Sequence, residues 1–264
     1  MGVLDYKILI KEMHPSKKMG QNFLVNDAVA RTEANFGLDR RVLELGPGLG
    51  ILTRELCWVA KAVVAVEKDP SLCEFLHENM RSKKLKVINS DFFKVDGKEL
   101  DADIMISNIP YNLSSKILGW LGSKQMPAVL CLQKEFVEHM LAKPSQNNYS
   151  KLSVFSSLQF SMTYIMDVHA NDFYPMPKVN SALVYLRPKK LRISKRSYEV
   201  LALLMMHKKK KVRNALIDSS KMLGIEKHSL SGLAEKSSYK DKRPFQMDSE
   251  ELLAASNEIS KLLK

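Results

Sequence analysis

Strand-like and helix-like segments alternate through the first two-thirds of the chain, and this alternation constrains the fold more than any other feature. Short apolar runs typical of buried strands cover residues 41–45, 62–66, 85–89, 104–107 and 129–132. Apolar residues spaced three to four apart predict helices over 51–59, 71–81, 114–121 and 135–141. Such alternation is typical of a parallel sheet whose strands are connected by helices. We therefore expect a Rossmann-like α/β domain.

The pattern changes after Lys151. Residues 162–169 and 179–187 are strand-like with no helix between them, and Pro175 and Pro177 lie in their connection. They predict an antiparallel hairpin that closes the sheet. Further along, apolar spacing predicts helices over 198–206, 212–223 and 249–263. We expect a first domain of residues 1–190 and a small all-α domain of residues 191–264.

Positive charge is concentrated in one stretch of the chain. Between Arg187 and Arg213 there are eleven basic residues and one acid, in a chain whose formal net charge is +12. Such a stretch attracts a polyanion, because neutralising phosphates releases condensed counterions, so RNA or DNA is the expected partner. The alternatives are a solvated lysine-rich linker and, less favoured, an anionic membrane surface. The candidate RNA-binding residues are Lys208, Lys209, Lys210, Lys211 and Arg213.

Composition argues against several other classes of protein. The three cysteines lie far apart with no CxxC spacing, and the six histidines show no paired spacing, so we expect neither a disulfide framework nor a metal site. No apolar run approaches the roughly 18 residues of a membrane helix, and no signal peptide is recognisable. We expect a cytoplasmic protein that does not enter the membrane and is a monomer by default.

A glycine-rich turn follows the first predicted strand. Residues 46–50 read GPGLG, and glycine permits a tight turn and close approach of a ligand to the backbone. The second strand ends at Glu67, where a carboxylate can accept both hydroxyls of a ribose. Together these features favour a nucleoside cofactor, and NAD and S-adenosylmethionine both fit. The GPGLG spacing favours S-adenosylmethionine, which has no pyrophosphate for a helix N-terminus to bind.

Two further motifs follow the third and fourth strands. Asp91, in the segment SDFF, can accept the amino group of an adenine beside an apolar wall, although a capping role is the common alternative. Residues 108–111 read NIPY. The Asn108 amide oxygen and the Ile109 carbonyl can accept the two protons of an adenine N6 amine, while Pro110 fixes the turn. Tyr111 offers a face to the base. An ordinary Asn-x-Pro turn is the alternative interpretation.

In order and together, these motifs resemble the ribosomal RNA adenine N6,N6-dimethyltransferases, which are related to the erythromycin-resistance methylases and the mitochondrial transcription factors B. The resemblance covers about residues 15–220. Besides the motifs above, it includes KMGQNFL at 18–24, LQKE at 132–135 and FYPMPKVNS at 173–181. It implies a class I methyltransferase sheet, S-adenosylmethionine as cofactor and ribosomal RNA as substrate.

The resemblance also implies roles for individual residues. Asn22 and Leu24 would close over the cofactor, Gly46 would approach its methionine end, Glu67 would hold the ribose and Asp91 the adenine. Asn108 would lie where cofactor and target base meet, and Phe173 would stack the flipped adenine against Tyr111; without the family, Phe173 would be a hydrophobic plug. The full expected cofactor set is Gln21, Asn22, Leu24, Gly46, Gly48, Glu67, Lys68, Asp91, Phe92 and Asn108, and the expected catalytic set is Asn108, Pro110, Tyr111 and Phe173.

The expected reaction is dimethylation of two adjacent adenosines in the 3′-terminal hairpin loop of small-subunit (16S) ribosomal RNA, within a 30S-type pre-ribosomal particle. Two alternatives stay open: an antibiotic-resistance methylase of the large subunit, and a non-catalytic RNA-binding or transcription factor on the same scaffold. The short C-terminal part and its lysine run differ from the bacterial pattern. This difference favours an archaeal or eukaryotic-type member, and we expect an archaeal one.

Overall fold

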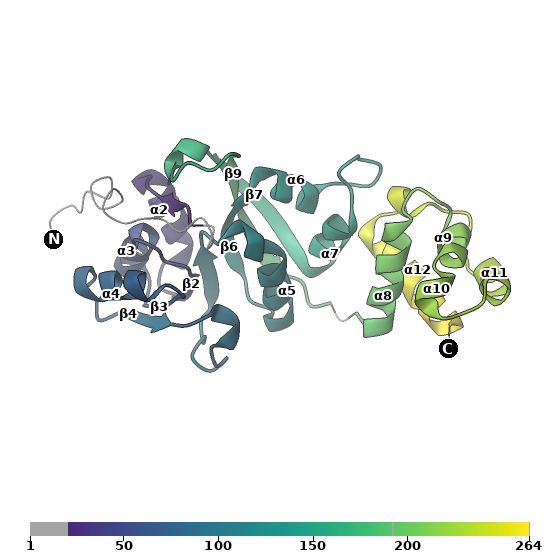
Figure 1. Cartoon of the computed structure of the whole chain (residues 1–264), viewed down its shortest axis with the longest axis horizontal. Helices are drawn as coiled ribbons and strands as arrows, with labels where there is room; N and C mark the ends of the chain where they lie inside the picture. Colours follow the sequence, from purple (N-terminus) through teal and green to yellow (C-terminus); the bar gives the residue numbers. More distant parts are fainter. Residues whose placement is uncertain (1–20, 192, 264) are drawn as a thin grey trace. The chain divides into compact units, whose positions relative to one another are not determined.

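The computed structural model describes residues 21–191 and 193–263 (Figure 1). Residues 18–20 of the predicted KMGQNFL motif and Arg192 of the basic stretch therefore lie outside the described residues. Contacts within the chain divide it into two compact units. One consists of residues 1–137 and 161–188, and the other of residues 138–160 and 189–264.

A seven-stranded sheet forms the centre of the first unit. Its strand order is β4-β3-β2-β5-β6-β9-β7. The pairs among the first five strands are parallel, whereas β9 runs antiparallel to β6. The bounds are β2 Arg41–Leu45, β3 Ala62–Glu67, β4 Leu85–Asn89, β5 Ile104–Ser107, β6 Ala128–Gln133, β7 Phe160–Val168 and β9 Ser181–Pro188. The predicted Rossmann-like sheet with an antiparallel closing segment is confirmed.

The helices of this unit begin at recognisable sequence signals. Asn26 caps α2 by accepting from the backbone N–H groups of Ala28 and Val29, and Asp69 caps α4, whose first residue is proline. Apolar residues of these helices pack on the sheet in one core with Val42, Ile104 and Ile106. The bounds are α2 Asp27–Ala34, α3 Ile51–Val59, α4 Pro70–Asn79, α5 Ser114–Lys124 and α6 Lys134–Leu141.

The strand order changes direction at β2. Strands β3 and β4 lie on one side of β2, and β5 and β6 lie on the other. Because β2 and β5 are neighbours, the connections that leave their carboxyl ends start side by side and run in opposite directions along the sheet. Such a switch point is where open parallel sheets bind ligands. It brings GPGLG and NIPY to the same edge of the sheet.

A two-stranded sheet was not predicted. It pairs β1 (Phe23–Leu24) antiparallel to β8 (Phe173–Tyr174), with Leu24 opposite Phe173. It joins two motifs about 150 residues apart in sequence, and Val25 N–H also donates to the Asp172 carbonyl at 2.7 Å. Strands of two residues are too short to show a periodic pattern, so sequence spacing could not reveal this pairing.

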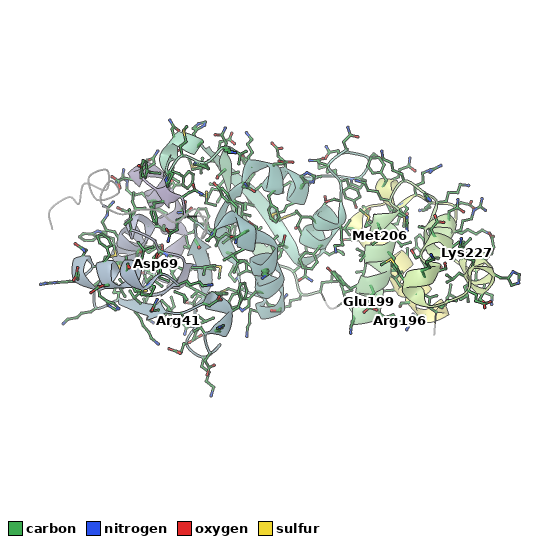
Figure 2. The ribbon with its side chains drawn as sticks, viewed as in Figure 1. Arg41, Asp69, Arg196, Glu199, Met206 and Lys227 are labelled. Atoms are coloured by element: carbon green, nitrogen blue, oxygen red, sulfur yellow. The ribbon has the colours of Figure 1, made fainter. Side chains whose placement is uncertain are left out.

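The second unit is helical. Its helices are α7 Lys151–Gln159, α8 Lys195–Met206, α9 Val212–Asp218, α10 Ser220–Leu223, α11 Lys227–Glu235 and α12 Ser249–Leu262. The predicted helix over 212–223 is interrupted at Ser219, and α7 and α11 were not predicted. In Figure 2, the side chains of Arg196, Glu199 and Met206 extend from α8, and Arg196 donates to the Leu263 carbonyl at 2.6 Å.

Residues 138–160 belong to the helical unit. From the sequence we expected them in the domain of the sheet. Val154 and Leu158 of α7 are buried in one core with Val200 of α8 and Leu252 of α12. Tyr149 is buried in the same core, and its hydroxyl donates to the Met247 carbonyl at 2.9 Å. The apolar face of α7 is therefore covered by helices that come later in the chain, a long-range contact that local spacing does not reveal.

Candidate active site

A pocket of about 360 Å³ lies at the switch point. Its lining comes from the ends of four parallel strands, from the segment before α2 and from Phe173. Every residue of the expected cofactor set except Leu24 lines it, as do Pro110, Tyr111 and Phe173 of the expected catalytic set. Leu24 lines a separate small cavity of about 30 Å³ that also touches Asn108. The structure thus brings the sequence motifs together, while the role of each residue remains a prediction.

The glycines of the turn after β2 are required by backbone conformation. Gly46 and Gly48 have φ angles of 67° and 58°, in the left-handed region that residues with a Cβ rarely adopt. A Cβ on Gly48 would lie 2.8 Å from the Phe23 ring. A Cβ on Gly46 would meet only Pro110, at 3.8 Å, because Gly46 borders the pocket. The turn therefore leaves room for a ligand at Gly46 and for Phe23 at Gly48.

Glu67 is held at the end of β3 by backbone hydrogen bonds. Its Oε1 accepts from the N–H groups of Lys68 at 2.8 Å and Asp69 at 2.9 Å, and its Oε2 accepts from Gly48 at 3.2 Å. Burial raises the pKa of Glu67, and these hydrogen bonds oppose that rise. A carboxylate oxygen can accept two hydrogen bonds, so Oε2 retains capacity for a hydroxyl donor.

Asp91 and Lys68 form an ion pair at the edge of the pocket. Lys68 Nζ lies 3.0 Å from Asp91 Oδ2, and Asp91 Oδ1 accepts from the backbone N–H of Phe93 at 3.1 Å. The hydrogen bond from Lys68 lowers the pKa of Asp91. Asp91 thus caps the short helix η3 (Phe92–Lys94), as the alternative interpretation proposed, and it also lines the pocket.

The NIPY segment follows β5. The side-chain oxygen Oδ1 of Asn108 is buried and makes no hydrogen bond, although the residue lines the pocket. Pro110 precedes the short helix η4 (Tyr111–Leu113), in which the Tyr111 hydroxyl lies 2.7 Å from Ser181 Oγ. Burial raises the pKa of Tyr111. The ring of Tyr111 is therefore fixed at its far end by β9.

Phe173 closes another side of the pocket. It is 5 % exposed and is held by the pairing of β8 with β1, whereas its neighbour Tyr174 is 45 % exposed. Gln21 also borders the pocket, and its side chain donates to Asp69 Oδ2 at 3.2 Å. Gln21 and Phe173, which are far apart in the sequence, thus line one pocket.

Several lining residues were not predicted. They include Leu72, Ser90, Asn112, Lys116 and Cys131. Lys116 could have been suspected, because it follows NIPY within two helical turns and adds a cation to the pocket. Cys131 lies on β6, and only the pairing of β5 with β6 brings it close.

Two buried glutamates behind the pocket were also missed. Glu44 of β2 is 2 % exposed and Glu33 of α2 is 0 % exposed. Burial raises the pKa of Glu44 to about 8, and burial followed by the nearby Glu44 raises the pKa of Glu33 well above its ordinary value. An acid within an otherwise apolar strand or helix face was the available sequence signal.

The predicted RNA-binding residues lie at the turn between α8 and α9 and at the start of α9. Lys208 points inward: its Nζ donates to the Tyr149 carbonyl and lies over the Phe245 ring. Lys210 and Lys211 pair with Asp218 at 2.6 Å and Asp241 at 2.9 Å. Arg213 lies 3.7 Å from both Glu235 and Asp241, and Lys209 is exposed. Lys208 thus has partners within the helical unit, and the RNA-binding role of all five residues stays a prediction.

Two features are absent from the described residues. Across 21–191 and 193–263, no cluster of three or more His, Cys, Asp or Glu side chains is arranged to hold a metal ion. None of the helices in those ranges is both long and apolar enough to span a membrane.

Comparison with known proteins identifies close relatives. The family model described as "Ribosomal RNA adenine dimethylase" matches residues 13–256. A protein of Thermococcus gammatolerans, named probable ribosomal RNA small subunit methyltransferase A, is 37 % identical over 94 % of this chain and 91 % of its own length. A protein of Methanococcus maripaludis with the same name is 37 % identical over 85 % of this chain and 89 % of its own length. These named relatives are archaeal.

Solved structures agree with the sequence relatives. A dimethyladenosine transferase from Plasmodium falciparum has a TM-score of 0.78 and 25 % identity, covering 91 % of this chain and 98 % of its own. The 23S rRNA methyltransferase ErmE has a TM-score of 0.61 at 22 % identity, covering 89 % and 100 %, which shows a shared fold. The family match over nearly the whole chain, the archaeal relatives and the expected motifs around one pocket lead to one conclusion: this chain belongs to the ribosomal RNA adenine dimethylase family.

Proposed function

We propose that this enzyme transfers methyl groups from S-adenosylmethionine to the N6 amines of two adjacent adenosines in the 3′-terminal hairpin loop of small-subunit ribosomal RNA. We further propose that it acts as a cytoplasmic monomer on a 30S-type pre-ribosomal particle. The observation that carries the proposal is the Asn108 carboxamide, which lines the same pocket as Glu67 and Phe173 and has an unpaired oxygen. The names of the archaeal relatives support the small subunit as the source of the RNA.

The pocket fits the proposed cofactor in shape and chemistry. Gly46 presents backbone without a side chain, Glu67 Oε2 can accept from a ribose hydroxyl, and the apolar Phe92 lies beside the polar Asp91. When bound, S-adenosylmethionine supplies an electrophilic methyl group. Glu67 and Asp91 would hold the adenosine part of S-adenosylmethionine, and Asn108 lines the same pocket.

The residues of the chain contribute mainly by positioning the target amine. A conjugated N6 lone pair is a poor nucleophile, and an amide oxygen and the Ile109 carbonyl that accept its protons favour a pyramidal nitrogen. Holding reacting groups in the productive geometry is worth large effective molarities, on the order of 10⁵ to 10⁸ M. We assign no general base, because the nitrogen loses its proton readily once it carries the methyl group.

The aromatic side chains would hold the base outside its stack. Extruding a base costs a few kcal/mol, and stacking on an aromatic ring returns roughly 1–3 kcal/mol. Phe173 and Tyr111 both border the pocket; pairing with β1 anchors Phe173, and a hydrogen bond with Ser181 of β9 anchors Tyr111. A second transfer to the same nitrogen requires a pocket that accepts a monomethylated amine.

Two alternative functions have less support. A large-subunit methylase would share the catalytic motifs, and the structural likeness to ErmE at 22 % identity concerns the fold alone. A non-catalytic RNA-binding factor would not need Glu67 and NIPY together at one pocket.

Mapping the methylated nucleotides tests the proposal. After reaction with small- and large-subunit RNA in pre-ribosomal particles, primer extension should stop at two adjacent adenosines of the small subunit. Asn108→Ala should lower transfer by roughly 100-fold or more, because misplacing the amine costs rate of that order. RNA affinity should change by only a few-fold. Stops on large-subunit RNA, or an Asn108→Ala enzyme with unchanged turnover, would contradict the proposal.

A further inference from the structure

Glu33 is a buried carboxyl group behind the pocket that the proposed reaction does not use. It lies on α2 and is 0 % exposed, and neither of its oxygens makes a hydrogen bond of normal geometry. A buried polar group without partners destabilises a protein, and a buried charge does so more strongly. Because such a group is costly, its position next to functional residues suggests a role.

Asn108 is the polar side chain that lies next to this carboxyl. Its side-chain amide lies within hydrogen-bonding reach of Glu33 and lowers the pKa of that carboxyl, against the larger opposite effects of burial and of Glu44. Asn108 Oδ1 is itself buried and unpaired. The donor side of the amide thus faces Glu33, while its acceptor oxygen has no partner.

Only a donated N–H lowers the pKa of a carboxyl, so Nδ2 of Asn108 is the atom that faces Glu33. In this orientation the N–H can donate to a carboxyl oxygen of Glu33, and Oδ1 is left to accept from a ligand in the pocket that Asn108 lines. We propose that Glu33 is a positioning residue that holds Asn108 in this orientation, so that the amide oxygen can accept a proton from the target amine. This inference rests on the proposed function, because it concerns the residue that would bind the amine.

The helix that carries Glu33 is well fixed at the pocket. Asn26, the cap of α2, donates through its side chain to Asp172 at 2.8 Å, next to Phe173. Arg54 of α3 pairs with Asp27 in the first turn of α2 at 2.7 Å. On the inner face, Val29 and Ala30 are buried in the core. Glu33 is therefore held by a rigid element, as accurate positioning of a second side chain requires.

The remaining neighbours of Glu33 are compatible with this role. Burial raises its pKa, and Glu44 adds to that effect, so a neutral carboxyl is favoured. Its carbonyl oxygen can still accept an N–H. The thiol of Cys131 is another titratable group near it, and burial raises the pKa of that thiol as well, which keeps it neutral. Of these neighbours, Asn108 is the one with N–H donors in its side chain.

Two substitutions of Glu33 separate positioning from packing. Glu33→Met keeps the size and helix propensity of the side chain but cannot hydrogen-bond, and it should lower kcat about tenfold, the value of one hydrogen bond of ordinary strength. The dissociation constant for S-adenosylmethionine should stay within twofold. Glu33→Gln keeps an acceptor oxygen and should retain kcat within about threefold. Adenine-N6 methylation of small-subunit RNA is the activity measured.

Melting temperature and activity, measured together, distinguish positioning from a purely structural role, because loss of a structural residue would lower both. Removing a buried carboxyl whose desolvation outweighs its hydrogen bond with Asn108 should raise the melting temperature of Glu33→Met, by roughly 2–4 °C for each kcal/mol gained, while activity falls. Ser156→Ala is the matched control, because Ser156 is buried and unpaired in the helical unit. It should leave kcat unchanged.

The outcomes distinguish the two proposals. If wild-type enzyme methylates no adenine N6, the proposed function fails. If wild-type is active, Asn108→Ala is inactive and Glu33→Met keeps full kcat, only the positioning role is overturned. If Glu33→Met does not fold, hydrogen exchange of the Asn108 side-chain amide in the wild-type protein tests the inference. The NMR signal of this amide is identified as the one missing from the spectrum of Asn108→Ala. We expect its exchange with water to be much slower than that of the exposed Asn257; equal rates would overturn the inference.

Discussion

At the scale of single residues, a substitution of Phe173 can distinguish stacking on the target base from simple filling of the pocket wall. Phe173→Leu keeps an apolar side chain at this buried position but removes the aromatic face. Because stacking contributes roughly 1–3 kcal/mol per base, we expect methyl transfer to fall about tenfold or more. Tyr174→Ala, at the exposed neighbouring position of β8, is the control and should have little effect. Equal rates for Phe173→Leu and wild-type enzyme would identify Phe173 as a plug.

Glu44 makes stability depend on pH. Its pKa is about 8 in the folded protein, because of burial, and near the ordinary value for glutamate when unfolded. Between those values the folded state binds more protons than the unfolded state, so stability falls as pH rises. Each pH unit in this window costs up to about 1.4 kcal/mol. Denaturant unfolding at pH 5 and pH 8 should therefore show a smaller loss in Glu44→Gln than in wild type; parallel losses would refute this origin.

The residues that sequence could predict are those whose chemistry depends on local backbone. Gly46 and Gly48 need positive φ angles, and Asn108 is followed by a proline that fixes its turn. These requirements leave a motif in the sequence. Glu33 and Glu44 left only an acid in an apolar segment, because their environment comes from elements distant in sequence. Their burial and their proximity to Asn108 required the fold.

At the scale of elements, the basic turn after α8 carries the expected contact with RNA. Its free positive charge is less than the sequence suggests, since Lys210 and Lys211 pair with acids. Exposed ion pairs are weak, and phosphates can compete for the lysines. Lys208 differs, because it donates to the Tyr149 carbonyl and lies over an aromatic ring. Docking is therefore expected to depend on Lys209 to Lys211 and Arg213.

Salt dependence of RNA affinity tests this expectation. Replacing Lys209, Lys210 and Lys211 with Gln should reduce the slope of log affinity against log salt by roughly one for each lost phosphate contact. The control is Lys227→Gln at the exposed start of α11, which lies outside the basic stretch (Figure 2). An unchanged slope in the triple variant would show that this turn is not the docking surface.

The elements that were not predicted from the sequence share one physical cause, which is their dependence on contacts with distant parts of the chain. The two-residue strands β1 and β8 exist only because they pair with each other. Helix α7 lies in a segment rich in serine, KLSVFSSLQ, whose apolar face is completed by α8 and α12. The central strands β5 and β6 were predictable, because their burial makes them almost entirely apolar.

At the scale of the whole molecule, the chain crosses between its two units more than once. The helical unit takes residues 138–160 from the middle of the methyltransferase sequence and the remainder from the C-terminal part. The expected boundary near residue 190 therefore separates α7 from the helices that cover it. The assignment of cofactor binding to the sheet unit and of RNA binding to the helical unit stays a prediction.

Truncation at that boundary should expose this dependence. A chain ending at residue 190 loses α8 and α12, which cover Val154 and Leu158, and also loses the acceptor of the Tyr149 hydroxyl at Met247. Burial of each such aliphatic side chain is worth about 1.5–3 kcal/mol, so the truncated chain should bind a hydrophobic dye and self-associate in size-exclusion chromatography. Changing Val154 and Leu158 to Ser in the truncated chain should restore a monomer, because the exposed face becomes polar. The same two changes in the full-length chain should lower its stability, since the face is buried there. A truncated chain that stays monomeric and binds no dye would mean that α7 does not depend on the later helices.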